Sequence, residues 1–179
     1  MIHDKKDLRD YLSADKKANM ISGYISERLS PTWRYIKCLR HSEYYQNRPK
    51  NLYTEMMRKL YRYKLMKLSV KTGITIPINT FGKGLYLPHY GSIVVNASAR
   101  FGDYCVVQNG INISEHAGGG NHIYIGAGAK IMAGVKIADY VIVGANAVVT
   151  RSIDRQNVVV AGVPAKIISD KGFKNRTKV

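Results

Sequence analysis

Histidines are the residues of this chain best suited to moving a proton near neutral pH, because an unperturbed imidazole titrates at about pH 6.5. The chain has five of them: His3, His41, His89, His116 and His122. We expect His3 and His41 to be ordinary surface residues, one near the terminus and one among charged neighbours in a helix. His122 falls in the turn of GGNH, where its expected role is structural. His89 and His116 are therefore the candidates for acid–base catalysis.

Both candidates lie at interruptions of a repeat that organises the middle of the chain. An apolar residue occupies every sixth position with one exception; the positions are Val95, Phe101, Val107, Ile113, Gly119, Ile125, Ile131, Ile137, Val143 and Val149. A period of six fits neither a helix, which repeats at about 3.6 residues, nor an isolated strand, which repeats at about 2. It indicates the hexapeptide repeat of a parallel β-helix, in which each side of a triangular coil turns one aliphatic residue toward the axis.

The two interruptions differ in kind. Between Leu87 and Val95 the repeat slips by two residues, within the string LPHYGSIVV that contains His89. Such a slip forces a bulge that aims a side chain off the regular surface, although the imidazole could simply hydrogen-bond the bulge itself. The second interruption is Gly119, which stands near His116 in the string SEHAGGG. Three consecutive glycines permit close approach of another backbone or of a ligand.

The composition divides the chain into three predicted regions. Residues 1–70 contain 16 Lys and Arg against 7 Asp and Glu, and they show helix-like spacing over residues 5–12, 31–45 and 52–68. We expect three helices there, with Tyr and Arg side chains packed against the solenoid. Residues 71–168 are the predicted β-helix domain, and residues 169–179 are a basic C-terminal tail, whose segment KGFKNRTKV is expected to be mobile. The predicted fold is mainly β, a parallel β-helix preceded by a basic α-helical region.

The formal net charge of +16 predicts attraction to phosphorylated metabolites, polyanions or an anionic membrane surface. The chain has no signature of a nucleic-acid-binding module, so nucleic acid is not an expected partner. It starts with charged residues and has no run of about 18 apolar residues, which favours a cytoplasmic location. Cys38 and Cys105 have no metal-ligand spacing. We therefore expect no metal site, and a buried thiol at Cys105.

Three strings carry a resemblance to a known family: KGLYLPHYGSIVVN, IYIGAGAKIMAGVKIADYVIVGANAVVT and VVVAGVPAKII. They resemble the hexapeptide acyltransferases, and within these the serine acetyltransferase-like O-acetyltransferases of polysaccharide biosynthesis. The resemblance extends over residues 70–168. It implies a left-handed parallel β-helix, a homotrimer with an active site in each cleft between neighbouring solenoids, and acetyl-CoA as the acyl donor. His89 matches the catalytic histidine of this family, which implies a role as general base.

The chemistry implied for His89 is removal of a proton from a hydroxyl as that hydroxyl attacks a thioester. A hydroxyl hardly ionises at neutral pH, so a positioned base is needed, and the same imidazolium can then protonate the departing CoA sulfur. Tyr90 and Gly91, which follow His89, are expected to contact the substrate. A backbone N–H near Gly91 or in the glycine-rich coil is a candidate donor to the oxyanion.

The chain departs from serine acetyltransferases around this histidine. Those enzymes have an aspartate directly before it, where this chain has Pro88, and another farther upstream, where this chain has Ile74 or Thr75. The ammonium group of an amino-acid acceptor would want an acidic partner, so the missing carboxylates favour a sugar hydroxyl as the acceptor. His116 aligns with a second catalytic histidine of that family, or with a substrate-loop position of the polysaccharide group.

The family pattern also assigns residues to the donor. Ala127 and Ala145 match positions where the coil contacts the pantetheine arm of CoA, and Lys166 matches a basic residue near its phosphates. Arg151 is added on charge and position alone. For each alanine the alternative is that a small side chain merely fits a crowded coil.

The sequence thus predicts an acetyl-CoA-dependent O-acetyltransferase that modifies a sugar hydroxyl during capsule, exopolysaccharide or O-antigen biosynthesis. The acceptor is expected to be a small molecule or a lipid-linked sugar, and the positive surface suits peripheral contact with an anionic membrane. Two alternatives stay open. One is a serine O-acetyltransferase of cysteine biosynthesis. The other is a non-catalytic solenoid that scaffolds a polysaccharide-assembly complex or binds a membrane through residues 1–70.

Overall fold

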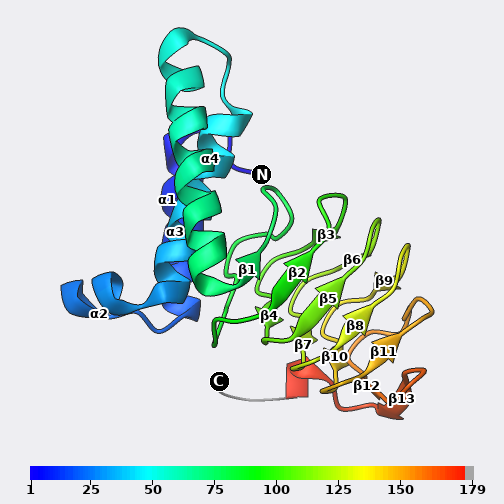
Figure 1. The fold of residues 1–179 in the computed structure, drawn as a ribbon. Coiled ribbons are helices and arrows are strands. Elements are labelled where there is room, and N and C mark those ends of the chain that lie inside the picture. The colour runs from blue at the N-terminus through cyan, green and yellow to red at the C-terminus, as the bar shows by residue number, and fades with distance from the viewer. Residues whose placement is uncertain (176–179) are drawn as a thin grey trace.

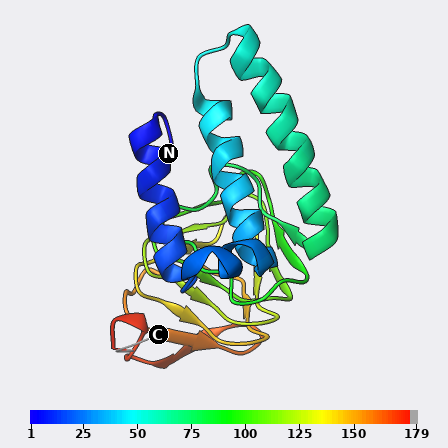
Figure 2. The same cartoon turned by 90° about the vertical axis from the view of Figure 1, so that its left-hand side faces the viewer.

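A helical region stands on one end of a solenoid in the computed structural model of the protein, which describes residues 1–175 (Figure 1, Figure 2). The helices are α1 (Lys5–Ala18), α2 (Gly23–Leu29), α3 (Pro31–Asn47) and α4 (Leu52–Thr72). The three predicted helices are present and extend beyond the segments with apolar spacing. The sequence does not predict α2, because seven residues are too few to show a helical period.

Capping residues set the helix ends. The Asp4 side chain accepts hydrogen bonds from two backbone N–H groups at the start of α1, and Ser30 does the same for one N–H of α3, where a proline occupies the first turn. Asn51 and Thr54 form a capping box at the start of α4. Gly73 ends α4 in the left-handed conformation, with φ of 70°. The chain then turns directly into the first coil.

The solenoid has three faces, each a sheet of short strands from successive coils. Face A contains β1 (Ile74–Thr75), β2 (Ile93–Val95), β5 (Ile111–Ile113), β8 (Lys130–Ile131) and β11 (Val148–Val149). Face B contains β3 (Arg100–Phe101), β6 (Gly118–Gly119) and β9 (Lys136–Ile137). Face C contains β4 (Val106–Val107), β7 (Tyr124–Ile125), β10 (Ile142–Val143), β12 (Val159–Ala161) and the antiparallel β13 (Lys166–Ser169).

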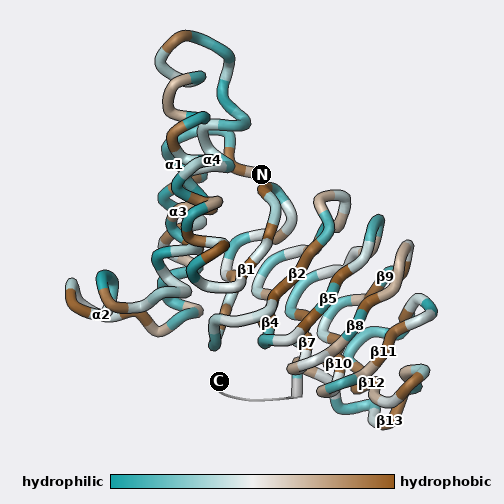
Figure 3. The backbone as a smooth tube through the Cα atoms, viewed as in Figure 1, coloured by the Kyte–Doolittle hydropathy of each residue, from teal (hydrophilic) through white to brown (hydrophobic). Residues whose placement is uncertain are grey.

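The register confirms the repeat that the sequence predicts. Ile93 pairs with Ile111, and Ile113 with Ile131, so one coil takes 18 residues. All the apolar residues of the six-residue series are buried and form one continuous core. Figure 3 shows hydrophobic residues recurring along the strands of each coil. The fold is therefore a left-handed parallel β-helix with an N-terminal helical region, as predicted.

Three edges, made of the turns between strands, join the faces. The A/C edge consists of residues 88–92, 108–110, 126–128, 144–146 and 162–164. The A/B edge consists of residues 96–98, 114–116, 132–134 and 150–152. The B/C edge consists of residues 102–104, 120–122, 138–140 and 154–157.

Polar side chains of α1 and α3 take the place of a missing coil above the first coil. On the face A side, the Tyr35 hydroxyl donates to the Ile76 carbonyl at 3.1 Å and accepts from the Ile76 N–H at 2.9 Å. On face C, Asp15 accepts from the Leu85 N–H at 2.9 Å, and Asn19 donates to the Leu85 carbonyl at 2.7 Å. Backbone groups that would otherwise be buried without partners are thereby satisfied.

Arg40 performs the same task on face B and is fully buried. Its guanidinium donates to the carbonyls of Phe81 and Gly82 at 2.9 and 2.6 Å, and it pairs with Asp15 at 2.7 Å and Glu43 at 2.9 Å. Burial alone would lower the pKa of Arg40, but the charges of Glu43 and Asp15 outweigh it and hold that pKa above its usual range. Arg40 therefore stays charged and ties α1, α3 and the first coil together.

The other end of the solenoid is covered by the chain returning on itself. The Gly172 N–H donates to the Asn157 carbonyl at 2.9 Å, and the Phe173 N–H to the Tyr140 carbonyl at 2.8 Å. Phe173 opens a short 3-10 helix, η1 (Phe173–Asn175), so the start of the tail that was predicted to be mobile packs on the last coils. Residues 176–179 of that tail lie outside the described residues.

The packing of Tyr and Arg side chains expected against the solenoid is made by Tyr35 and Arg40 of α3. The apolar spacing of α4, in contrast, does not mark a buried face. Leu52, Met56 and Tyr63 are 91%, 58% and 55% exposed, because α4 packs on α3 through its opposite side (Figure 1). No helix among the described residues is long and apolar enough to cross a membrane.

Removal of the Arg40 side chain should destabilise the whole protein. Arg40→Ala leaves the buried carboxylates of Asp15 and Glu43 without their cation, which costs on the order of 3–5 kcal/mol. Arg34→Ala, an exposed arginine on the same helix, should change stability by less than about 0.5 kcal/mol. Urea denaturation followed by circular dichroism measures both, and equal stabilities of the two variants would contradict the role assigned to Arg40.

Candidate active site

The His89 loop forms where the sequence slips by two residues. Leu87 and Ile93 both point into the core and are separated by a longer connection than the corresponding Val107 and Ile111 of the next coil. The extra residues leave the side chains of His89 and Tyr90 exposed on the A/C edge. The predicted bulge is therefore present, and it aims both side chains outward.

The end of α4 supports this loop. The Gly91 N–H donates to the Thr72 carbonyl at 2.8 Å, and Gly91 has a φ of 121° that favours glycine. A Cβ on Gly73 would approach the Gly91 carbonyl to 3.0 Å, so the close contact between the two residues favours glycine at position 73. Because the Gly91 N–H is already bonded, it does not serve as the free oxyanion donor considered above.

The His89 imidazole has no hydrogen bond, ion pair or ring contact with any other part of residues 1–175. The purely structural alternative, in which the ring hydrogen-bonds its own bulge, is therefore not realised. No acidic residue lies on the A/C edge either. The ring is an exposed imidazole with both nitrogens accessible.

Successive coils extend the A/C edge from His89 toward the far end of the solenoid. Backbone hydrogen bonds stack its corners, including Gly128 N–H to the Asn109 carbonyl at 2.9 Å and Asn146 N–H to the Ala127 carbonyl at 2.8 Å. Ala127 and Ala145 are both exposed on this edge. The crowded positions between successive coils are occupied by the neighbouring glycines and not by these alanines. A Cβ on Gly126, for example, would lie 2.7 Å from the Ala145 nitrogen.

Lys166 lies just beyond the last corner of the same edge, at the start of β13. The Ala165 N–H donates to the Val148 carbonyl at 2.8 Å and fixes this turn against the preceding coil. The Lys166 side chain is exposed, and its ammonium has no ion pair within the described part of the chain. The structure thus places His89 and the two alanines along one edge, with Lys166 just beyond its last corner.

His116 and Arg151 lie on the A/B edge, so one chain does not bring them together with His89. The backbone of His116 is well fixed: its φ is 55°, its N–H donates to the Ser98 hydroxyl at 2.8 Å, and its carbonyl accepts from the Lys136 ammonium at 2.8 Å. The His116 and Arg151 side chains are exposed. Face A separates the two groups of candidate residues.

The glycine run beside His116 is explained by internal packing. A Cβ on Gly119 would lie 2.3 Å from Ile123 and 3.0 Å from the ring of Phe101, which stacks on Phe81 at 5.1 Å. The space of the missing inward side chain is thus filled by Ile123 and by the Phe101 ring. A Cβ on Gly120 would collide with the Asp139 carboxylate. Of the two alternatives expected for these glycines, close approach of another backbone is confirmed, since a Cβ on Gly118 would lie 2.7 Å from the Arg100 carbonyl oxygen. Room for a ligand is not supported, because the chain's own atoms fill the space.

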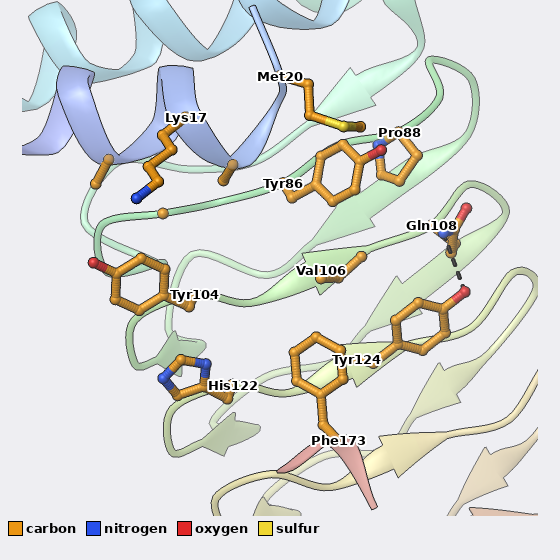
Figure 4. A pocket seen from close by; sticks show the side chains of 13 residues that line it. Lys17, Met20, Tyr86, Pro88, Tyr104, Val106, Gln108, His122, Tyr124 and Phe173 are labelled. Carbon is orange, nitrogen blue, oxygen red and sulfur yellow. Dashed lines mark hydrogen bonds between the residues drawn. The ribbon is translucent and has the colours of Figure 1, made fainter. Parts of the chain in front are cut away.

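An aromatic groove on face C is a feature that the sequence analysis missed (Figure 4). We call it the face C groove; its volume is about 540 Å³, and it is lined by Ala14, Lys17, Ala18, Met20, Gly84, Tyr86, Pro88, Tyr104, Val106, Gln108, His122, Tyr124 and Phe173. α1 forms one wall and the successive coils form the floor. Pro88 and Gln108 connect the groove to the A/C edge beside His89.

A stack of rings forms the B/C side of this groove. His122 stacks on Tyr104 at 5.1 Å and on Tyr140 at 4.9 Å, and all three residues have positive φ. Their spacing of 18 residues, one per coil, is the signal by which the stack could have been found in the sequence. His122 therefore has the structural role expected of it, and it also lines the groove.

The remaining candidates for chemistry are inert or differ from expectation. Cys105 is fully buried, and this burial raises the pKa of its thiol to about 12, so the thiol stays protonated at neutral pH. His41 is half-buried rather than an ordinary surface residue: it stacks on Tyr61 at 5.2 Å, and burial lowers its pKa.

No group of three or more His, Cys, Asp or Glu able to hold a metal is found in residues 1–175.

Comparisons with known proteins define the class of the repeat. Residues 120–151 match the family model described as bacterial transferase hexapeptide (six repeats). This segment contains the coils that present Ala127 and Ala145 on the A/C edge. The repeat of this chain is therefore of the hexapeptide kind found in bacterial transferases.

The individual relatives are serine acetyltransferases. The chain is 30% identical over 112 residues to the serine acetyltransferase of Synechococcus elongatus, a match that covers 58% of this chain and 46% of that protein. The matched region thus spans less than half the length of this curated relative. The crystal structure of serine acetyltransferase from Brucella abortus is similar with a TM-score of 0.72 and 24% identity, covering 94% of this chain and 69% of the other.

A serine acetyltransferase structure in complex with CoA has the same TM-score of 0.72, with 22% identity over 92% of this chain and 71% of the other. At these identities the likeness shows the fold, including the helical region that precedes the solenoid.

Proposed function

We propose that the protein is an acetyl-CoA-dependent O-acetyltransferase in which His89 is the general base. The observation that carries this proposal is the arrangement of the A/C edge, with His89 at one end, two exposed alanines in successive coils, and Lys166 at the other end. Four coil steps of about 4.8 Å each separate these ends, roughly 19 Å in all. Such a span suits a long flexible arm that carries a reactive group at one end and phosphates at the other.

The residues of the edge fit the donor. Ala127 and Ala145 leave the backbone of their corners accessible, and Lys166 offers phosphate a cation that has no ion pair among residues 1–175. Bound acetyl-CoA would supply an acetyl group activated as a thioester. The CoA complex of a serine acetyltransferase with the same fold supports this choice of donor.

The exposed imidazole of His89 then performs the proton transfers. It accepts the proton of the acceptor hydroxyl while the hydroxyl oxygen bonds to the acetyl carbon, and the carbon–sulfur bond of the thioester breaks. The imidazolium returns its proton to the departing sulfur, so the histidine ends the cycle neutral. General-base assistance of this kind contributes about 10²–10⁴ in rate.

We propose that the working unit is a homotrimer with the site between neighbouring solenoids. His116 and Arg151 lie across face A from His89 within one chain. They join the His89 site only if a second copy presents its A/B edge there. In that arrangement His116 acts beside His89, and Arg151 adds a second cation for the donor phosphates, while Tyr90 and Gly91 contact the acceptor.

Two acceptors are candidates. The names of the relatives favour the hydroxyl of L-serine over the sugar hydroxyl that the sequence led us to expect. A specific observation keeps the sugar as the second candidate: the A/C edge carries no carboxylate to hold the ammonium group of an amino acid.

Substitution of His89 tests the proposed base. His89→Ala should lower kcat/KM by about 10²–10⁴, because the acceptor hydroxyl loses its proton acceptor. The measurement is CoA release from acetyl-CoA with L-serine, monosaccharides and nucleotide sugars as acceptors. His3→Ala, an exposed histidine near the N-terminus, is the matched control and should behave as the wild type. Full activity of His89→Ala with every acceptor used by the wild type would remove His89 from the mechanism.

Substitution of Lys166 tests the direction of the donor along the edge. Lys166→Ala should weaken binding of CoA by roughly tenfold, which corresponds to about 1.4 kcal/mol, through loss of a charge-assisted contact to phosphate. Binding of pantetheine, which lacks the phosphates, should not change. Calorimetry with both ligands and with the exposed Lys171→Ala as control distinguishes the two cases. An equal loss for CoA and pantetheine would place Lys166 elsewhere than at the phosphates.

A further inference from the structure

We propose that the face C groove is the acceptor subsite and that it takes an anionic pyranose, a sugar ring that bears a carboxylate or a phosphate. This inference rests on the proposed acetyl transfer and specifies the acceptor of the same site. The groove is a built feature of the chain, since one helix, three successive coils and the returning tail all contribute to it.

The position of the groove joins it to the proposed chemistry. Pro88 lines the groove and is bonded to His89, while Gln108 belongs both to the groove and to the A/C edge. A ligand in the groove therefore reaches the edge at the coil from which the His89 loop projects. Donor on the edge and acceptor on face C would meet at the imidazole.

The size of the groove suits a sugar better than a small amino acid. A volume of about 540 Å³ lies within the range of about 300–1,000 Å³ that is usual for small-molecule sites. L-serine would fill only a small part of this volume and would leave most of the apolar wall exposed to water. A monosaccharide or disaccharide would cover far more of it.

The lining combines apolar rings with polar tips, as a pyranose requires. Val106 forms a nearly buried floor, and Tyr86, Tyr124 and Phe173 stand around it (Figure 4). The C–H faces of a sugar can lie on such rings, and its hydroxyls can bond to the groups at the rim. Gln108 donates to the Tyr124 hydroxyl at 3.1 Å, which fixes one polar pair at this rim.

The B/C side of the groove carries further hydrogen-bond donors. Its two groove-lining rings, Tyr104 and His122, belong to a stack that Tyr140 continues outside the groove. Gly84 makes room for this stack, because a Cβ at that position would lie 2.3 Å from the Tyr104 ring. The hydroxyls of Tyr86 and Tyr104 have no hydrogen-bond partner in the described part of the chain. They are therefore available to a ligand.

Lys17 gives the groove its charge preference. It extends from α1 toward the wall that holds Tyr104 (Figure 4), and its ammonium forms no ion pair with the residues the structure describes. None of the groove residues is acidic. A ligand with one negative group would neutralise this cation. L-serine also carries a carboxylate, but its ammonium group would find no acidic partner in the groove.

Binding measurements without acetyl-CoA test the groove separately from catalysis. The full chain is titrated by calorimetry with methyl β-D-glucuronide, α-D-glucose 1-phosphate, neutral methyl β-D-glucoside and L-serine. We expect at least one of the two anionic sugars to bind more tightly than the glucoside, and the stronger of the two identifies the source of the charge. Serine should not bind. Absence of sugar binding at millimolar concentration, or binding of serine in their place, would overturn the proposal.

Three variants locate any binding that is found. Lys17→Ala should weaken the anionic sugar by roughly fivefold, the scale of an exposed charge pair, and leave the glucoside unchanged. Lys6→Ala, an exposed lysine on the same helix outside the groove, should change neither. Tyr86→Ala should weaken both sugars, with folding checked by circular dichroism. If Lys17→Ala and Lys6→Ala behave alike and Tyr86→Ala binds as the wild type, the sugar lies elsewhere and the proposal fails.

The same experiments separate the two proposals. His89→Ala should retain sugar binding, because its ring does not line the groove. If sugars bind but no acetyl group is transferred, the groove stands and the acetyltransferase proposal fails. If serine is acetylated and no sugar binds, the acetyltransferase stands and the groove proposal fails.

Discussion

Hydrogen bonding from coil to coil is the constraint on which this structure depends. Each coil satisfies its backbone groups only through its neighbours, so a solenoid of this kind is incomplete at both ends. The helices solve the problem at the first coil with buried polar side chains, among which Arg40 reaches two carbonyls and two carboxylates. The returning tail closes the far end. The helical region is thus part of the solenoid's bonding and not an independent appendage.

The same cap also shapes the candidate site. α4 ends in Gly73, whose left-handed turn brings its backbone against Gly91, and the Thr72 carbonyl receives the Gly91 N–H. The loop that presents His89 is therefore fixed by the junction between helix and solenoid. The regular coils beyond it contribute a straight edge, on which small residues recur at each corner. In the proposed function, chemistry is concentrated where the regular pattern is interrupted, and the regular part would support an extended ligand.

Much of the fold follows from the sequence because a period of six indicates one structure, the hexapeptide β-helix. The apolar residues of this series from Val95 to Val149 are buried as predicted. The His89 bulge follows for the same reason, since two extra residues must leave the coil. The run around Gly119 does not reveal its role in the sequence, because a glycine can make room either for a ligand or for the chain's own atoms, and here Ile123 and the Phe101 ring take that space. The face C groove was missed because α1 and Phe173 are distant in sequence from the coils they meet.

The central claim is that the A/C edge holds the acyl donor with its reactive end at His89. A crystal structure of the full chain with CoA tests this most directly. We expect the pantetheine arm along the corners of Ala127 and Ala145, its sulfur beside the His89 imidazole, and its phosphates toward Lys166. CoA bound along the A/B edge of the same chain, away from His89, or within the face C groove would contradict the account.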